Sequence, residues 1–122
     1  MALFDQLPVY KECYSLLYMF FKELNNVPRD IKFTLVQSLR NDLVSMMVCV
    51  YKANSNINRI DNVQLAREIL AGVIIKVRLL HDLQHISTKF YAQASNRMES
   101  ISKQLTAWQK YMIQSAEPDR NC

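Results

Sequence analysis

The sequence contains very few residues that make tight turns or break helices. Its 122 residues include one glycine and three prolines. Sheets and loop-rich folds need many such residues, so this scarcity excludes them and favours a few long helices joined by short connections. The length suits one domain with a single core. We therefore predict one all-α domain over residues 1–122, an antiparallel up-and-down four-helix bundle.

Long apolar runs and cysteine motifs are also missing. The longest apolar stretch, 43–51, is far shorter than the roughly 20 residues of a membrane span. Residues 1–5 lack the basic and apolar regions of a signal peptide. The three cysteines are odd in number and form no CxxC motif, and Cys13 and Cys49 lie among apolar neighbours. These features favour buried free thiols and a cytoplasmic protein without a membrane partner.

Four segments show helical periodicity, at about 8–25, 28–53, 60–85 and 88–115, and we expect a frayed tail over 116–122. Pro8 and Pro28 suit first helical turns, Ser87 suits an N-cap, and the Asn- and Ser-rich residues 54–58 form a connection. The apolar stripes expected to face the core are, helix by helix, Tyr10, Cys13, Tyr14, Leu17, Phe20, Phe21 and Leu24; Leu35, Leu39, Leu43, Met46, Met47 and Val50; Leu65, Ile69, Leu70, Val73, Val77, Leu80 and Leu83; Phe90, Tyr91, Ala94, Met98, Ile101, Leu105, Trp108 and Met112.

The second and third helices are more apolar than one core requires. Within 43–51 only Ser45 is polar, so this stretch is apolar nearly all round. Ile74, Ile75 and Leu79 widen the stripe of the third helix. Because one side of each helix in a four-helix bundle normally faces water, we expect another subunit to cover the excess.

Residues typical of catalytic or metal sites are sparse. His81 and His85 have the i, i+4 spacing that places two ligands on one helix face, but no HExxH glutamate accompanies them. A polar helix end, with cationic His favoured by the helix dipole, is the alternative. No nucleophile motif and no glycine-rich phosphate loop is present. We predict no enzymatic activity, no metal and no cofactor.

The basic residues form stripes when they are placed on helices. The formal charge is +4, and between residues 28 and 112 there are 12 Lys and Arg against 6 Asp and Glu. At about 100° per residue, basic side chains share a face on the second, third and fourth helices. Such faces can neutralise phosphates, although a solvated face that keeps the bundle soluble has the same pattern. The candidate phosphate contacts are Arg29, Lys32, Arg40, Arg67, Arg78, Lys103 and Lys110.

Several segments resemble a bacterial four-helix-bundle family. They are Leu-Pro-Val-Tyr-Lys at 7–11, Pro-Arg-Asp-Ile-Lys-Phe-Thr-Leu at 28–35, Val-Tyr-Lys-Ala-Asn at 50–54, and Ile-Ser-Lys-Gln-Leu at 101–105 followed by Trp108. This family contains the accessory variability determinant (Avd) of diversity-generating retroelements and the proteins encoded in intervening sequences of 23S rRNA genes. The first and third segments are closer to the Avd branch. The sequence departs from the pattern at Val36 and at Thr106-Ala107, where glycines are common.

The resemblance implies a homopentameric ring with a basic surface and a central pore. It also implies binding to a reverse transcriptase and to its template RNA, in support of mutagenic copying into cDNA. We therefore expect a cytoplasmic, non-enzymatic accessory protein that holds RNA or an RNA–DNA hybrid by its phosphates. The alternatives are an oligomeric protein–protein scaffold or a 23S intervening-sequence protein of unknown role.

Overall fold

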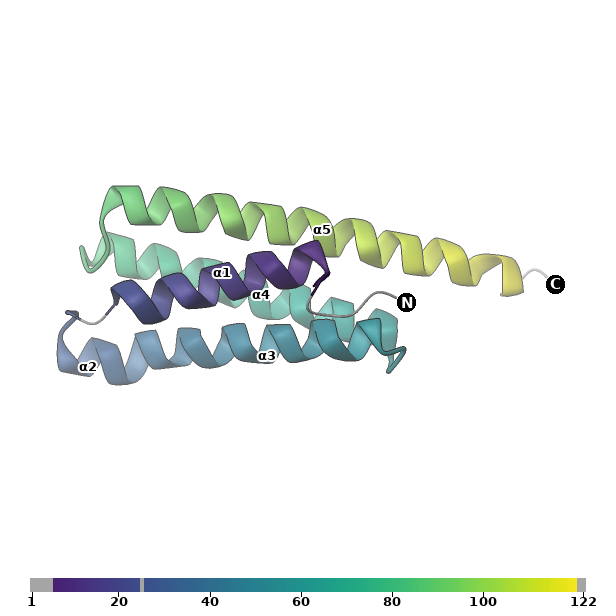
Figure 1. Ribbon diagram of the computed structural model, residues 1–122, viewed down its shortest axis with the longest axis horizontal. Helices are drawn as coiled ribbons and strands as arrows, with labels where there is room; N and C mark the ends of the chain where they lie inside the picture. Colours follow the sequence, from purple (N-terminus) through teal and green to yellow (C-terminus); the bar gives the residue numbers. More distant parts are fainter. Residues whose placement is uncertain (1–5, 25, 121–122) are drawn as a thin grey trace.

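The computed structural model describes residues 6–24 and 26–120, and of 116–120 it describes the backbone alone. Within these residues the chain forms four long helices and no strand, as predicted (Figure 1). The second long helix contains three consecutive segments. The elements are α1 (Pro8–Glu23), α2 (Arg29–Ile31), the π-helical turn η2 (Lys32–Val36), α3 (Gln37–Asn54), α4 (Arg59–Asp82) and α5 (Thr88–Arg120).

The helices lie side by side as a bundle. Helices α1 and α4 each pack against both α3 and α5, so α1 and α4 occupy opposite corners. The α1–α2 and α4–α5 connections lie at one end of the bundle, and the α3–α4 connection lies at the other, beyond which α5 projects (Figure 1). None of the helices in the described ranges is both long and apolar enough to cross a bilayer.

Local signals fix several helix ends. Pro8 is the first residue of α1, Asp30 lies in the first turn of α2, and Pro28 precedes that turn as its N-cap residue. The Ser87 hydroxyl accepts a hydrogen bond of 3.0 Å from the backbone N–H of Phe90, which confirms the predicted N-cap of α5.

Three boundaries differ from the predicted ones by more than one residue. Helix α1 ends at Glu23, and Asn25, its predicted last residue, lies outside the described residues. Helix α4 ends at Asp82 because Gln84 adopts a left-handed φ of 65°, which a right-handed helix does not allow. Helix α5 continues past Ser115 to Arg120, and residues 121–122 of the predicted frayed tail lie outside the described residues. A proline at 118 removes one backbone donor, and the alanine and glutamate before it favour helix.

The core confirms the predicted stripe of α5 and corrects those of α1 and α4. In α1, Val9 and Leu16 are buried, whereas Tyr14 and Phe21 of the predicted stripe are exposed. In α4 the buried stripe keeps Leu70, Val73, Val77 and Leu80 of the predicted one. Its members are Val63, Ala66, Leu70, Val73, Val77 and Leu80, while Leu65 and Leu83 are exposed. Both helices carry two neighbouring apolar stripes, and periodicity alone does not decide which of them faces inward.

The π-helical turn η2 changes the phase of the second long helix. A π-turn closes i→i+5 hydrogen bonds and so inserts one residue, which rotates the following faces by about 100° relative to an unbroken α-helix. Val36 is accordingly fully buried, and Leu35, which the uniform period placed in the core, is half-buried. Inside the turn the Thr34 hydroxyl donates a 2.6 Å hydrogen bond to the Asp30 carbonyl.

Candidate nucleic-acid interface

Two candidate cations begin the second long helix. Arg29 is the first residue of α2, is exposed, and lies over the Phe33 ring at 5.6 Å from guanidinium carbon to ring centroid. Lys32 follows one turn later, at the start of η2, and is half-buried. Phe33 itself is 60% exposed. Arginine over an exposed aromatic ring at a helix end can contact both a phosphate and a base.

Arg40 does not share that surface. Beyond η2 its guanidinium lies 4.3 Å from the Phe21 ring centroid, and one Nη donates a 3.0 Å hydrogen bond to the Phe20 carbonyl. Its Nε is buried without a hydrogen-bond partner. These contacts hold the Arg40 side chain against α1, so its guanidinium is not available beside Arg29 and Lys32 as a phosphate contact.

The two candidates of α4 engage neighbouring side chains. Arg67 donates through one Nη to the Oε1 of Gln109 on α5, a buried amide whose Nε2 donates a 2.9 Å hydrogen bond to Gln64. Arg78 forms a 3.7 Å ion pair with Asp82 one turn away, and both side chains are well exposed. Arg67 therefore ties α4 to α5, whereas the Arg78 pair contributes little to stability and leaves the cation accessible.

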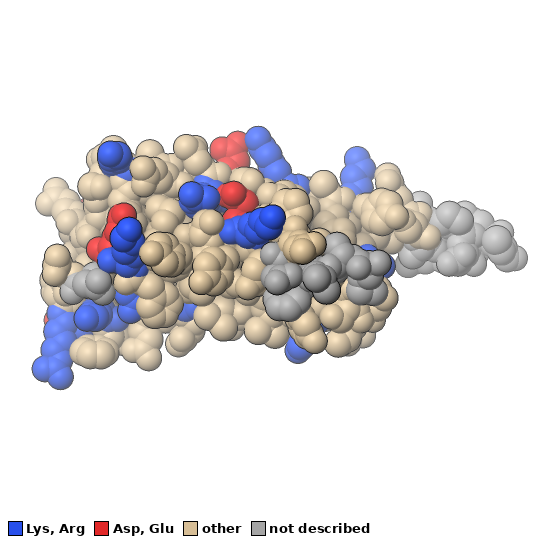
Figure 2. Space-filling model, in the orientation of Figure 1, with Lys and Arg blue, Asp and Glu red and all other residues tan. Residues whose placement is uncertain are grey.

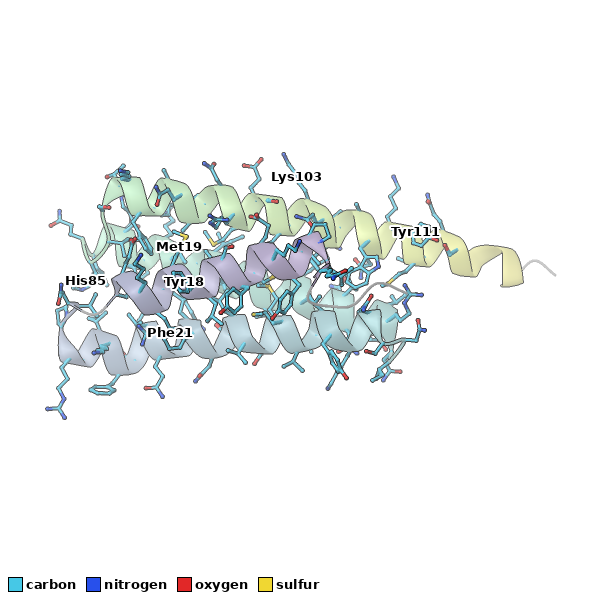
Figure 3. All side chains as sticks on the ribbon, viewed as in Figure 1. Tyr18, Met19, Phe21, His85, Lys103 and Tyr111 are labelled. Atoms are coloured by element: carbon cyan, nitrogen blue, oxygen red, sulfur yellow. The ribbon has the colours of Figure 1, made fainter. Side chains whose placement is uncertain are left out.

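Both candidates of α5 project into solvent. Lys103 points away from the bundle in Figure 3 and forms an exposed 3.0 Å ion pair with Glu99. Lys110 is exposed two turns farther along, on the same side of the helix. The part of α5 near Tyr111, which is 63% exposed, extends past the other helices (Figure 3).

The seven candidates are thus not gathered into one patch. In the view of Figure 2, Lys and Arg side chains lie in several groups, some of them beside carboxylates, with uncharged surface between the groups. Two cations outside the predicted set, Lys22 and Lys89, lie near the α1–α2 and α4–α5 connections, at the end that carries Arg29 and Lys32 (Figure 1). The placement of residues on single helix faces does not show that these four cations lie at the same end, because they come from three helices that meet there.

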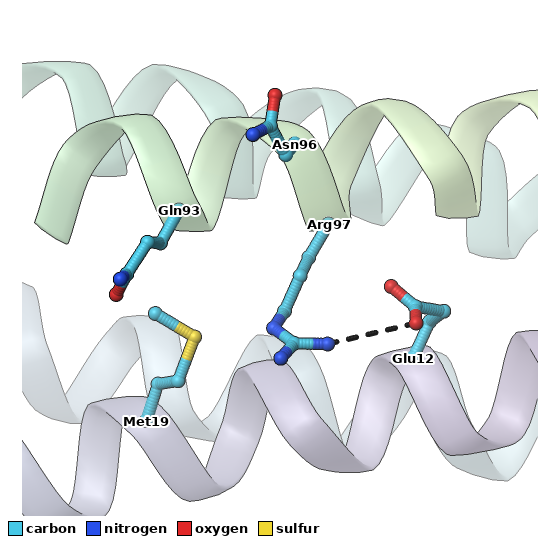
Figure 4. A pocket seen from close by; sticks show the side chains of 5 residues that line it. All are labelled: Glu12, Met19, Gln93, Asn96 and Arg97. Atoms are coloured by element: carbon cyan, nitrogen blue, oxygen red, sulfur yellow. Dashed lines mark ion pairs between the residues drawn. The ribbon is translucent and has the colours of Figure 1, made fainter. Parts of the chain in front are cut away.

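The groove between α1 and α5 carries no free cation. It is lined by Glu12, Met19, Gln93, Asn96 and Arg97, and Figure 4 shows Arg97 reaching across it to Glu12. The two side chains form a 3.5 Å ion pair. Because the Glu12 carboxylate neutralises the guanidinium, this groove is a poor phosphate site.

The described cysteine and histidine side chains, Cys13, Cys49, His81 and His85, do not come together as a metal site or as a nucleophile with its base. Cys13 and Cys49 are buried free thiols, as predicted. Burial and the neighbouring Glu12 carboxylate raise the pKa of Cys13 to about 12, the reverse of what a nucleophilic thiolate needs. His81 stacks on Tyr91 with ring centroids 4.3 Å apart, and His85 follows the end of α4, so the predicted shared helix face is wrong. The described residues hold no cluster of three or more metal-binding side chains.

Two apolar surfaces remain exposed. The first, here the aromatic face, spans α1 and α3. It consists of Tyr14, Tyr18, Phe21, Val44, Val48 and Tyr51. The second, here the aliphatic face, lies on the side of α4 that faces away from the core. It consists of Leu65, Ile75, Leu79 and Leu83. The excess apolar residues noted in the sequence therefore lie at the surface of a single chain.

Comparison with known proteins identifies the family. The profile of the bAvd-like family matches residues 8–112, which include α1, α2, η2, α3, α4 and most of α5. A search of curated proteins gave no match.

Proposed function

The chain belongs to the bAvd-like family, and we propose that it is a non-enzymatic accessory protein of a diversity-generating retroelement, acting in the cytoplasm. In this proposal antiparallel four-helix bundles form a homopentameric ring. The ring binds template RNA, or an RNA–DNA hybrid, by its phosphates and docks the reverse transcriptase. The observation that carries the proposal is the family match over nearly the whole bundle.

Exposed cations supply the physical mechanism. Arg29 at the bundle end and Lys103 and Lys110 along α5 all face solvent. A cation that meets a phosphate releases condensed counterions, so affinity falls steeply with salt. Five copies at +4 each give a ring of about +20, and each stripe is repeated around it. A ring can therefore bind RNA tightly although each bundle presents few free cations.

Fluorescence anisotropy with a structured RNA, from about 50 to 300 mM salt, tests the proposal. We expect sub-micromolar binding at low salt that weakens steeply as salt rises. The double variant Lys103→Glu/Lys110→Glu should weaken binding without lowering Tm, whereas the matched control Lys103→Arg/Lys110→Arg should keep both. Absence of binding even at the lowest salt would contradict RNA binding as a property of this protein alone.

A protein–protein scaffold is the second candidate, and one observation favours it. Several cations on the bundle are already matched by carboxylates in the described residues, namely Lys76 with Asp42, Arg78 with Asp82, Arg97 with Glu12 and Lys103 with Glu99. On this hypothesis the ring meets RNA only through the polymerase. The scaffold would be supported if the protein captures a reverse transcriptase and does not bind RNA by itself at any salt concentration. A gene inside a 23S rRNA gene would favour the intervening-sequence branch instead.

A further inference from the structure

The aromatic face is a continuous surface formed by two helices. On α1, Tyr14, Tyr18 and Phe21 follow each other at steps of four and three residues, and on α3 Val44, Val48 and Tyr51 repeat the same steps. Arg40 joins the two rows, because it extends from α3 onto the Phe21 ring. Tyr18 and Phe21 lie between the ribbons of α1 and α3 on the viewer's side in Figure 3.

The size of this face calls for a protein partner. Its aromatic members Tyr14, Tyr18, Phe21 and Tyr51 are 53%, 56%, 52% and 46% exposed. At about 150–250 Å² for each aromatic side chain, the exposed part amounts to roughly 400 Å² before the two valines are added. That is in the range of the largest patch on a typical monomer, about 300–600 Å², and such patches commonly mark interaction sites.

The aliphatic face is a second apolar surface of different shape. Ile75 is 68% exposed, and Leu65, Leu79 and Leu83 are each about half exposed. Gly72 lies among them, and a Cβ built there would meet no atom within 4 Å. The face therefore contains a shallow gap beside aliphatic side chains. It lies on α4, at the corner of the bundle opposite α1.

Two charges beside the aromatic face and two beside the aliphatic face are unpaired among the described residues and opposite in sign. Lys76 and Arg78, also beside the aliphatic face, are paired with Asp42 and Asp82. Lys11 lies one turn before Tyr14, and Lys52 follows Tyr51 directly. Asp61 lies one turn before Leu65, and Glu68 follows Leu65 by one turn. None of these four side chains forms an ion pair with another described residue. The aromatic face thus has free cations at its edge, and the aliphatic face has free anions.

The four charges lie in the same half of the bundle. Helix α3 ends and α4 begins at one end of the bundle, and α1 begins a short distance inside that end (Figure 1). Lys11, Lys52 and Asp61 lie in the terminal turns at that end, and Glu68 lies about two turns farther along. Two copies with parallel axes, related by a rotation, would therefore bring the cations of one copy against the anions of the next.

We propose that the aromatic face of one copy packs on the aliphatic face of the next, with Lys11 and Lys52 facing Asp61 and Glu68. This inference rests on the ring in the proposed function and names its contact. A head-to-tail contact covers both apolar faces with one kind of interface, and repetition by rotation closes a ring. A two-fold contact of the aromatic face with itself would leave the aliphatic face and its carboxylates uncovered.

Charge reversal on either side tests the contact. The variants are Lys11→Glu/Lys52→Glu and Asp61→Lys/Glu68→Lys, and light scattering after gel filtration measures the mass of each. Like charges then face each other across the contact. We therefore expect the Kd of self-association to rise by at least about tenfold for each variant alone. An equimolar mixture should regain association in alternating assemblies, because each variant supplies the face that complements the other. It should not regain a closed ring of five, because alternation around five positions leaves one contact between like-charged faces. The control Lys103→Glu/Lys110→Glu changes the charge equally and should keep the wild-type mass.

Three outcomes would overturn the proposal. The first is wild-type protein that stays monomeric at about 100 µM, far above the Kd expected for a stable interface. The second is unchanged mass when only one of the two faces is reversed. The third is loss of RNA binding by Lys11→Glu/Lys52→Glu at unchanged mass, which would make the aromatic face an RNA surface. The salt-dependent RNA binding of the wild type is measured separately, so failure of this contact can be told apart from failure of RNA binding.

Discussion

Replacement of Arg40 tests whether this cation stabilises the bundle or binds phosphate. Arg40 was a candidate phosphate contact from the sequence, yet its guanidinium hydrogen-bonds the Phe20 carbonyl and covers the Phe21 ring. Phe20 carries one of the last four carbonyls of α1, which lack partners farther along the helix. We therefore expect Arg40→Met to weaken the bundle and to leave RNA binding unchanged.

The magnitude follows from three contributions. Loss of the charged hydrogen bond costs about 1.5–3 kcal/mol, and loss of the cation–π contact costs about 0.5–2 kcal/mol. Removal of the buried, unpartnered Nε regains about 1–3 kcal/mol of desolvation, and methionine keeps the apolar stem. The net expectation is a loss of about 1–2 kcal/mol, or about 3–8 °C in Tm for a domain of this size.

The assay pairs urea unfolding, at one protein concentration, with the RNA salt titration. Lys103→Met is the matched control, because it removes an exposed charge and should change the free energy of unfolding by less than about 0.5 kcal/mol. It should also lower the salt slope by about 0.7–0.9. If Arg40→Met instead unfolds like the wild type while its salt slope falls, Arg40 is a phosphate contact and the reasoning is refuted.

Three further predictions concern single residues. Gly72→Ala should raise the free energy of unfolding by about 1 kcal/mol in urea, since the added methyl meets no neighbour, and a decrease would contradict the open space around it. Ser87→Ala should cost about 1 kcal/mol, because the Phe90 N–H loses its cap, and an unchanged urea midpoint would contradict the cap. In a Cys122→Ser background no thiol should react with a disulfide reagent at pH 8. Cys13 keeps its proton in the folded state up to about pH 12 while the unfolded thiol ionises near 9.0, so its contribution lowers the free energy of unfolding as pH rises between these values.

Features set by local chemistry were predictable from the sequence. The Ser87 cap depends on residues within one turn, and so does Pro8 as the first residue of α1. The connection after α3 was predictable for the same reason, since Asn56 and Asn58 adopt positive φ values of 63° and 42° that asparagine tolerates. The count of four long helices in the described residues follows from the spacing of such signals.

The candidate site was less predictable, because it depends on distant residues. The π-turn at η2 could not be predicted from the hydrophobic period, yet it buries Val36 fully where the uniform period placed Leu35. Arg40 engages the Phe20 carbonyl of another helix. The partner of Arg67 is Gln109, forty-two residues away. Placement on helix faces shows which cations share a helix side. It does not show which ones a carboxylate, an amide or a carbonyl of another helix already engages.

The exposed residues in the predicted stripes of α1 and α4 have a common physical cause. A helix that packs against the rest of the protein on one side only carries one apolar stripe. The period of that stripe then identifies the core-facing residues without ambiguity. Helix α1 carries a second stripe through Tyr14 and Phe21, and α4 carries one through Leu65 and Leu79. A second apolar stripe requires a second packing partner, which a single bundle does not provide. Sequence reasoning that otherwise agrees with a fold is expected to fail at functional surfaces. The two failures coincide with the two faces proposed to meet between copies, so the ambiguity of the sequence itself supports that contact.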